Sequence, residues 1–175
     1  KHYNKIKYPI DLYILTCYSF NYQIRFNSKL EFNMPYGSRQ FSENMKNNLQ
    51  RFTNVIKNIK FTSIDFRKFP YDKLNKNDLV YCDPPYLIST ATYNENGSWT
   101  EQEEKDLLHM LNKLNENNVK FALSNVLIHQ GIKNELLTDW AKDYKIHYLN
   151  CDYTNCSYHK KDKETKSVEV LITNY

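Results

Sequence analysis

The first third of the chain contains two different hydrophobic patterns. Pro9 to Phe20 is an apolar run compatible with a helix, and Gln23 to Asn33 then alternates apolar with polar residues, as a half-buried strand does. Asn27-Ser28-Lys29 fits a turn that would fold this second stretch into a β-hairpin. Ser42 to Ile59 repeats apolar residues at helical spacing, and Ser42 belongs to a residue type that caps helices. The pattern therefore predicts two helices with a β-hairpin between them.

Beyond about residue 60, short apolar segments alternate with amphipathic ones. Five segments have the composition of buried strands: Lys60 to Ile64, Leu79 to Cys82, Lys120 to Ser124, Lys145 to Leu149 and Ser167 to Thr173. One helix is predicted from a Thr100/Glu103 capping box to about Leu114, and another from Ile128 to Ala141. Strands separated by helices predict an α/β fold with a mostly parallel sheet covered on both faces. Because no helical segment separates the last two strands, we expect them to form an antiparallel hairpin at one sheet edge.

Length and composition limit the class of protein. The chain has 175 residues, of which 41% are hydrophobic and 25% charged, as expected for one globular domain or part of one. No apolar run approaches the roughly 18 to 20 residues of a membrane span, and the lysine-rich start lacks the core of a signal peptide. We therefore expect a soluble, cytoplasmic chain with no membrane partner. The change of pattern predicts one region over residues 1–58 and a second over residues 59–175.

Cysteine and glycine usage narrows the chemistry. The four cysteines lack the spacing of a disulfide framework, which favours reduced thiols. Cys151, Cys156 and His159 are a conceivable zinc set, but their spacing fits no zinc pattern well, so we expect no metal. The three glycines are too scattered to form a phosphate-cradling loop; they are Gly37, Gly97 and Gly131.

Charge is distributed unevenly along the chain. Residues 1–60 contain ten lysines and arginines against three acidic residues, whereas residues 61–175 contain 14 against 17. The basic residues of the first third are interleaved with aromatic ones, a composition typical of surfaces that face polyanions. A solvated basic face is an equally good interpretation of the charge alone.

The predicted strand Leu79 to Cys82 runs directly into Asp83-Pro84-Pro85-Tyr86. Two prolines end the strand and fix an extended turn without N–H donors, at the sheet edge where ligands of α/β proteins bind. The carboxylate of Asp83 and the carbonyl of Pro84 can accept the two hydrogens of an exocyclic amine, while Tyr86 offers a face for the ring. An electrophilic methyl group held in line would complete a displacement. The alternative is a strand-ending turn with a surface acid, which the strand context makes the weaker interpretation.

DPPY after a strand resembles the signature of amino-methyltransferases, and the chain is similar to the Dam-like, D12 class of DNA adenine-N6 methyltransferases found in restriction-modification systems. Four segments resemble that family in the same order: NSKLEFNMPYG (Asn27 to Gly37), LVYCDPPYLISTAT (Leu79 to Thr92), FALSN (Phe121 to Asn125) and VEVLITNY (Val168 to Tyr175). The resemblance implies a partial Rossmann-like methyltransferase sheet with a small helical and β-hairpin DNA-recognition region. It also implies S-adenosylmethionine as methyl donor, double-stranded DNA as partner, and bacterial or phage origin. Residues 1–58 would then recognise the target, and residues 59–175 would form a catalytic half-domain.

The resemblance also assigns roles to individual residues of the second region. The catalytic residues around a flipped adenine would be Asp83, Pro84, Pro85 and Tyr86, with Asp83 also beside the methyl donor. Asp65 and Phe66 resemble the pair that meets the adenine ring of the donor, although Asp65 could instead cap a helix. Ser124-Asn125 resemble a motif that supports the target pocket, or else form a strand-to-helix turn.

The basic first region has the family's position for target recognition. Phe20 and Asn21 resemble residues that wedge into the duplex, Arg25 resembles a base-reading arginine, and Pro35 resembles a residue that packs near a thymine methyl group. Two further residues complete the expected DNA-binding set, namely Asn33 and Arg39. Four positions depart from the family pattern and leave a GATC target open: Tyr22, Gln23, Leu30 and Ser38.

The chain contains neither the lysine motif nor the glycine-rich F-x-G-x-G turn with which the family begins and which hold the methionine and ribose of the donor. We therefore expect the carboxyl-terminal part of a methyltransferase that lacks its amino-terminal half and is inactive alone. It could be a fragment, a subunit of a split enzyme or a degenerate product. Two other functions stay open: a non-catalytic DNA-binding remnant of such an enzyme, and an amino-methyltransferase that acts on RNA or protein.

Overall fold

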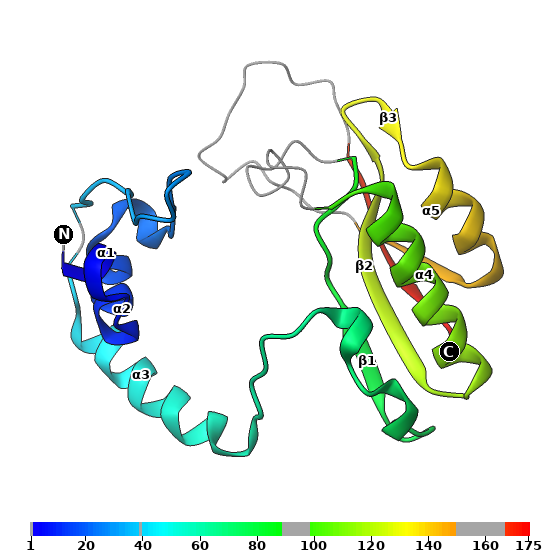
Figure 1. Ribbon diagram of the computed structural model, residues 1–175, viewed down its shortest axis with the longest axis horizontal. Coiled ribbons are helices and arrows are strands. Elements are labelled where there is room, and N and C mark those ends of the chain that lie inside the picture. The colour runs from blue at the N-terminus through cyan, green and yellow to red at the C-terminus, as the bar shows by residue number, and fades with distance from the viewer. Residues whose placement is uncertain (1, 39, 89–98, 150–166) are drawn as a thin grey trace. The chain divides into compact units, whose positions relative to one another are not determined.

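The computed structural model describes residues 2–38, 40–88, 99–149 and 167–175. Its internal contacts divide the chain into two compact units, Lys1–Thr62 (unit 1) and Ser63–Tyr175 (unit 2) (Figure 1). The sequence places the boundary between its two regions at residue 58. What each region does stays a prediction at this point.

Unit 1 is built mainly from three helices. They are α1 (His2–Ile6), α2 (Pro9–Tyr18) and α3 (Glu43–Val55), followed by the short 3-10 turn η2 (Ile56–Asn58). α2 begins with proline, whose missing N–H breaks no helical hydrogen bond in the first turn. α3 begins after Ser42, whose hydroxyl accepts a hydrogen bond from the N–H of Met45 at 3.3 Å. Both helices that the sequence predicts for this region are therefore confirmed.

Between α2 and α3 the chain reverses direction without forming regular strands. An isolated β-bridge joins Phe26 and Phe32. The side-chain oxygen of Asn27 accepts hydrogen bonds from the N–H groups of Lys29 and Glu31, each at 2.9 Å. Backbone hydrogen bonds also join Asn27 to Glu31 and Asn33 to Arg25, so the predicted β-hairpin is present as a short turn with one bridge and without regular strands.

Gly37 fixes a second close approach in unit 1. Its N–H donates a hydrogen bond to the carbonyl of Tyr18 at 2.8 Å, and the adjacent Tyr36 forms a β-bridge with Ser19. A Cβ atom at position 37 would lie 2.6 Å from the carbonyl oxygen of Ser19. Only glycine fits this approach without a shift of the backbone.

Unit 2 contains a mixed five-stranded sheet. Its strands are β1 (Leu79–Cys82), β2 (Lys120–His129), β3 (Ile132–Lys133), β4 (Lys145–Leu149) and β5 (Val168–Thr173). The order is β1-β2-β5-β4, with β3 paired to the end of β2. β1 and β2 are parallel, and every other described pair is antiparallel. The α/β class and the antiparallel pairing of the last two strands are confirmed. The mostly parallel sheet is wrong for the described residues, because β5 inserts between β2 and β4 antiparallel to both.

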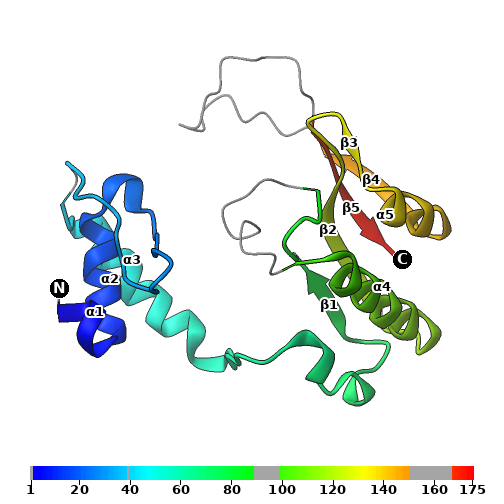
Figure 2. The same ribbon diagram turned by 45° about the horizontal axis from the view of Figure 1, so that its top comes forward.

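Two helices cover one face of this sheet, as Figure 2 shows. α4 (Glu101–Glu116) begins with the predicted capping box, and α5 (Glu135–Trp140) continues into η5 (Ala141–Asp143). The core between helices and sheet is apolar and fully buried; it includes Leu111, Leu114, Phe121, Leu123, Leu137, Val170 and Ile172. Within the described part of unit 2, α4 and α5 share a face, so the prediction of helices on both faces does not hold there. No helix in the described ranges has the length and apolar character needed to cross a membrane.

The predicted helix from Ile128 to Ala141 is wrong in its first half. β2 continues to His129 and turns through Gln130 and Gly131, whose φ angles are 51° and 78°. Positive φ at both central residues is the geometry of a two-residue hairpin loop, and it returns the chain as β3. The helix begins only after Asn134, whose side chain accepts a hydrogen bond from the N–H of Leu137 at 3.0 Å.

The predicted strand Lys60 to Ile64 is also wrong. These residues pair with no strand among those that the structure describes. Phe61 and Ile64 are 69% and 53% exposed. An extended segment needs a neighbouring strand to satisfy its N–H and C=O groups, and sequence pattern alone does not supply that neighbour.

Candidate active site

The DPPY segment follows the parallel pair of strands. Cys82, the last residue of β1, lies beside Leu123 of β2. The residues that follow them are therefore neighbours: Asp83 lies just beyond the end of β1, and Ser124 lies within β2. Asp83 is exposed, and the three residues after it are half-buried. The structure thus gathers the DPPY segment and the Ser124-Asn125 motif, which lies inside β2 and not in a strand-to-helix turn.

A cavity of about 440 Å³ lies between β1, α4 and two 3-10 turns, η3 (Phe66–Lys68) and η4 (Tyr71–Lys73). The cavity wall is mostly aromatic and aliphatic; it includes Phe66, Phe69, Tyr71, Leu74, Val80, Cys82, Asp83, Pro84, Trp99, Leu107 and Met110. The rings of Phe66 and Trp99 lie with centroids 5.8 Å apart and planes tilted by 41°. A planar apolar ligand is the kind of molecule that such a wall accepts.

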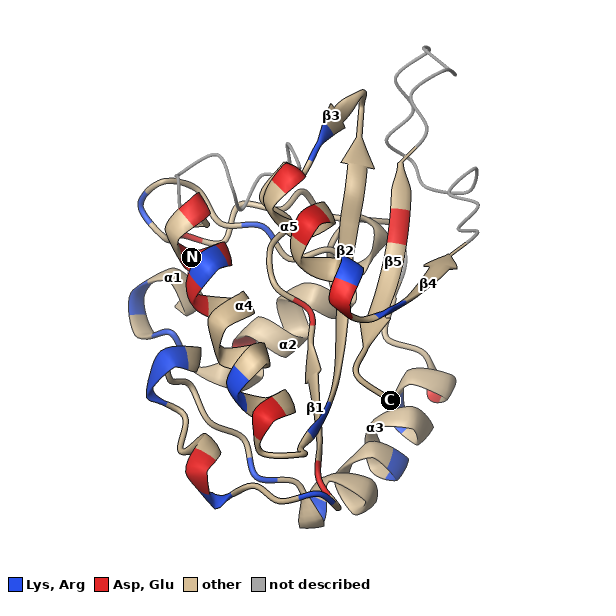
Figure 3. Ribbon diagram, turned by 90° about the vertical axis from the view of Figure 1, so that its right-hand side faces the viewer, with Lys and Arg blue, Asp and Glu red and all other residues tan. Residues whose placement is uncertain are grey.

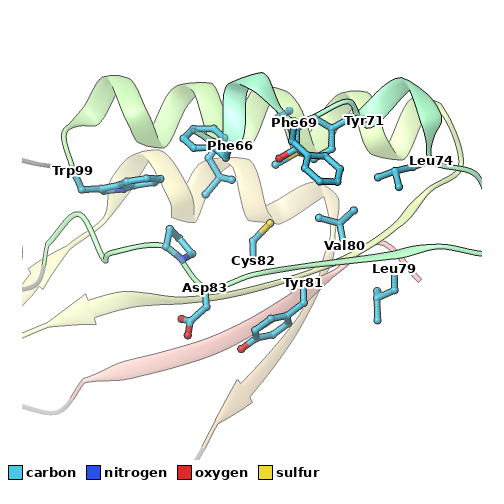
Figure 4. A pocket seen from close by; sticks show the side chains of 13 residues that line it. Phe66, Phe69, Tyr71, Leu74, Leu79, Val80, Tyr81, Cys82, Asp83 and Trp99 are labelled. Carbon is cyan, nitrogen blue, oxygen red and sulfur yellow. The ribbon is translucent and has the colours of Figure 1, made fainter. Parts of the chain in front are cut away.

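The side chains of β1 point alternately into and away from this cavity. Figure 4 shows Val80 and Cys82 on the side of the aromatic rings, with Tyr81 and Asp83 on the opposite side of the strand. Asp83 therefore stands at the cavity rim with its carboxylate directed away from Phe66. A ligand on that side of the strand could meet the carboxylate, while a second ligand occupies the cavity.

Two ionisable groups in the cavity wall remain neutral. Burial raises the pKa of the Cys82 thiol to about 11, and chiefly burial raises the pKa of Tyr71 to about 12. The thiol is thus not a nucleophile near neutral pH. The wall therefore offers a ligand shape and apolar contact, and hydrogen bonds to the ligand would come from groups at the rim.

Tyr86 connects the DPPY segment to β2. Its hydroxyl lies 3.4 Å from the Oγ of Ser124. Burial raises the pKa of Tyr86, while the hydrogen bond with Ser124 acts in the opposite direction. The phenol therefore stays protonated near neutral pH, and this contact helps to fix the direction of its ring.

Phe66 lines the cavity, and Asp65, the residue before it, is joined through Arg67 to α4. Asp65 caps η3 by accepting a hydrogen bond from the N–H of Arg67 at 2.9 Å, as one of its two predicted roles requires. The guanidinium of Arg67 contacts the carboxylates of Glu103 at 3.1 Å and Asp106 at 2.7 Å, and it lies 4.8 Å from the centre of the Phe66 ring. This network holds Phe66 beside α4. Contact of Asp65 and Phe66 with a methyl donor stays a prediction.

The sequence analysis missed two residues: Trp99, which lines the cavity, and Glu104, which accepts a hydrogen bond from it. Glu104 is fully buried, and its carboxylate accepts hydrogen bonds from Trp99, Asn125 and Asn134. Burial raises its pKa, and the three hydrogen bonds oppose that rise. The usable signal was an acidic residue on the apolar stripe of α4, three positions before Leu107.

The predicted DNA-binding residues of unit 1 form two contacts at its surface. The guanidinium of Arg25 donates from Nε to Oδ1 of Asn33 at 3.0 Å and from Nη2 to its carbonyl at 2.9 Å. The N–H of Phe20 donates to the carbonyl of Pro35 at 2.9 Å, and the Phe20 ring is 51% exposed. Asn21 has a φ of 51°, in the left-handed region.

Five residues that the sequence analysis singles out lie outside the described residues: Arg39, Gly97, Cys151, Cys156 and His159. In the part of the chain that is described, no group of three or more His, Cys, Asp and Glu residues could hold a metal ion.

Comparison with known proteins identifies the family. Residues 1–155 match the model of the D12 class N6 adenine-specific DNA methyltransferase family. The chain is 48% identical over 182 residues to the type II methyltransferase M.FokI of Planomicrobium okeanokoites, covering 99% of this chain and 28% of that protein. It is 44% identical over 185 residues to the modification methylase StsI of Streptococcus sanguinis, covering 100% of this chain and 28% of the relative. It is also 32% identical to the modification methylase LlaI of Lactococcus lactis subsp. lactis, with coverage of 99% and 28%.

The chain thus spans little more than a quarter of the length of these relatives, at 28% of each. The match nevertheless extends over nearly all of its own residues and includes the DPPY segment and the basic first region. The chain belongs to the D12 class of N6 adenine-specific DNA methyltransferases.

Proposed function

We propose that the chain carries the target-recognition and catalytic parts of an enzyme that transfers a methyl group from S-adenosylmethionine to N6 of an adenine flipped out of double-stranded DNA. One observation supports this most strongly. The DPPY segment leaves β1 at the sheet edge with Asp83 at the rim of an aromatic cavity and Tyr86 bonded to Ser124 on the neighbouring strand. Two planar ligands can therefore approach Asp83 from different sides.

The cavity fits the adenine ring of the donor in both shape and chemistry. Phe66 and Trp99 offer aromatic faces, and Asp65, the residue before Phe66, carries carboxylate oxygens that can accept from an amine. We infer that Asp65, Phe66 and Asp83 contact the donor, which supplies a methyl group on a positively charged sulfur. No glycine-rich turn for the methionine part occurs in this sequence of three scattered glycines. We infer that a further segment, not included in these 175 residues, supplies it.

The DPPY residues then act on the adenine amine. The carboxylate of Asp83 and the carbonyl of Pro84 would accept hydrogen bonds from its two N–H groups, which would turn the nitrogen lone pair toward the methyl group. The new N–C bond would form as the bond from that methyl carbon to sulfur breaks, so that S-adenosylhomocysteine leaves and the methylated amine releases one proton to water. Pro85 has no N–H that could compete for these acceptors. Tyr86 stacks on the base, and Ser124 orients Tyr86. In this proposal, orientation of the adenine amine and stacking of the base promote the transfer, and neither a thiolate nor a metal-bound base takes part.

Unit 1 is the proposed DNA-recognition region, within residues 1–58. The Arg25–Asn33 pair holds a guanidinium in a fixed direction, as a base-reading arginine requires. The exposed Phe20 ring has the properties of a side chain that wedges between base pairs. The remaining residues proposed to contact DNA are Asn21, Pro35 and Arg39. The bacterial relatives support a bacterial or phage origin and action on DNA in the cytoplasm.

The test replaces Asp83 by Asn in the protein at its full natural length. Asp83→Asn keeps the shape and removes the charge-assisted hydrogen bond, so the transition state should lose about 2 to 4 kcal/mol, or roughly thirty- to a thousandfold in rate. Tritium transfer from labelled S-adenosylmethionine to unmethylated duplex DNA in a single turnover measures this loss, and DNA affinity should stay unchanged.

Asp143→Asn is the matched control, because it makes the same chemical change at an exposed residue of η5 outside the cavity wall. It should keep the normal rate. A normal rate for Asp83→Asn would refute the catalytic role of DPPY. DNA binding without any methyl transfer by the unsubstituted protein would indicate a DNA-binding remnant.

A further inference from the structure

Glu104 is a buried carboxylate in the first turn of α4 that receives three hydrogen bonds from different elements. Its Oε2 accepts one from Nε1 of Trp99 at 2.9 Å. Its Oε1 accepts one from Nδ2 of Asn125 at 3.3 Å and one from Nδ2 of Asn134 at 3.1 Å. Glu104, Asn125 and Asn134 are between 0% and 2% exposed, so water cannot readily replace any of these contacts.

The direction of all three hydrogen bonds is fixed. An indole N–H can only donate. The Oδ1 of Asn125 already accepts the N–H of Val126 at 2.8 Å, and the Oδ1 of Asn134 accepts the N–H of Leu137 at 3.0 Å. Each asparagine must therefore present its amide N–H groups to Glu104. The side chain at position 104 must accept hydrogen bonds at both of its terminal atoms. The two oxygens of an ionised carboxylate can do so, whereas an amide has one oxygen and one N–H₂ group.

The two asparagines are anchored in the scaffold, whereas Trp99 belongs to the cavity. Asn125 lies within β2, and Asn134 caps α5. Trp99 lies in the cavity wall, 5.8 Å from the Phe66 ring (Figure 4). The carboxylate thus transmits the position of β2 and α5 to an aromatic ring that a ligand in the cavity would touch.

We propose that Glu104 is a positioning residue for the methyl donor: anchored by Asn125 and Asn134, it holds the Trp99 ring in the orientation that the donor's adenine requires. This inference rests on the proposed function of the cavity. Glu104 touches neither substrate nor donor, and its effect is on donor affinity. At saturating donor, the transfer step depends on Asp83 and Tyr86, which Glu104 does not contact in the described structure.

Glu104→Gln tests the proposal in the protein at its full natural length. The single amide oxygen should turn to the two asparagines, leaving the amide N–H₂ group against the indole N–H of Trp99. A buried N–H group without an acceptor costs free energy, so the Trp99 ring should move. The affinity for S-adenosylhomocysteine should then fall roughly tenfold. Titration calorimetry measures that affinity. The single-turnover rate at saturating S-adenosylmethionine should change by less than about threefold.

Trp99→Phe provides the matched background, because it removes the indole N–H that faces Glu104. In that background Glu104→Gln should cause no further loss of affinity for S-adenosylhomocysteine, because the indole N–H that the substitution would leave without an acceptor is absent. If the two substitutions lower the affinity independently, so that their effects multiply in the double variant, the proposal is refuted. It is also refuted if Glu104→Gln lowers the melting temperature and leaves the affinity unchanged, because Glu104 then has a structural role alone.

The remaining outcomes also decide the question. If Glu104→Gln does not fold, Trp99→Phe alone must weaken S-adenosylhomocysteine binding, and unchanged affinity there would refute the proposal. If the unsubstituted protein binds no S-adenosylhomocysteine, the proposed function of the cavity has failed. Binding by the unsubstituted protein together with full affinity in both single variants would overturn only the role of Glu104.

Discussion

Tyr86 combines two functions that ordinary substitutions can separate. Its hydroxyl contacts Ser124 at 3.4 Å, while its ring is the surface on which we propose that the flipped base stacks. The hydrogen bond helps to set the direction of the ring, and in the proposed role the ring area would supply the binding energy for the base. The hydroxyl should thus matter less than the ring.

Tyr86→Phe and Tyr86→Ala separate these contributions. Loss of the hydroxyl should weaken base capture by about 0.5 to 1.5 kcal/mol, the range of one net hydrogen bond. Loss of the ring should cost about 1 to 3 kcal/mol in stacking and should lower turnover as well. Fluorescence of 2-aminopurine at the target position reports base capture, and single-turnover methylation reports the rate. Equal damage from the two substitutions would show that the hydroxyl, and not the ring, holds the base.

At the scale of elements, locally encoded features were predictable and long-range ones were not. The cap at Ser42 and the Thr100/Glu103 capping box mark helix starts within a few residues of sequence, and both are confirmed. The hairpin after β2 was missed because Gln130, a residue that seldom takes positive φ, occupies its first central position. The antiparallel insertion of β5 depends on pairs of residues at least 40 positions apart in the chain, such as Ile128 with Val168, which periodicity does not report.

The candidate site divides in the same way. The contiguous DPPY segment could be found from sequence because four adjacent residues carry it. Trp99 and Glu104 could not be found in this way, because their importance depends on contacts between residues far apart in the sequence. Trp99 contacts Phe66, and Glu104 contacts Asn125. An acidic residue on an apolar helix stripe is nevertheless a local signal that merits attention in similar sequences.

The capping box of α4 makes stability depend on pH. The hydrogen bonds from Thr100, and to a smaller extent the one from Arg67, lower the pKa of Glu103 from 4.5 to about 2. A lowered pKa in the folded state means that this contribution is present above about pH 4.5 and is lost as the pH falls toward 2. Acid should therefore weaken the start of α4.

Thr100→Ala removes this capping interaction and should destabilise the protein by about 1 kcal/mol at neutral pH, the usual cost of a lost N-cap. The difference in melting temperature between the two proteins should shrink as the pH falls from 4.5 to 2, because Glu103 is then protonated in both. Thermal unfolding followed by circular dichroism measures it. A difference that stays constant over this range would assign the effect to Thr100 without Glu103.

For the molecule as a whole, the charge of unit 1 should dominate DNA affinity. Residues 1–62 contain ten lysines and arginines against three acidic residues. Several of them are exposed on α3 and η2, where Figure 3 shows basic positions in blue; they include Lys46, Arg51 and Lys57. Phosphate contacts release counterions, so such binding weakens as salt is added.

Raising the salt concentration from 50 to 200 mM should weaken duplex binding at least about tenfold, which corresponds to roughly two neutralised phosphates. Fluorescence anisotropy with a labelled duplex measures the slope of affinity against salt. Arg51→Gln should reduce that slope while leaving the methyl-transfer rate at saturating DNA unchanged, because Arg51 lies outside the proposed catalytic and donor-binding residues. Binding that does not respond to salt would contradict a phosphate-dominated interface.

The strand order has a consequence for the way in which the protein is made. β1 and β2 can pair as soon as residue 129 has left the ribosome, but among the described strands β4 pairs with β5 alone. During translation, Lys145–Leu149 therefore has no partner among the described strands until Val168–Thr173 has been synthesised and has inserted beside β2. A premature stop codon ahead of Val168 would delete β5 and leave β4 without its described partner, so the sheet would lose both strands. The edge of β2 that β5 normally covers would then be exposed to chaperones and proteases.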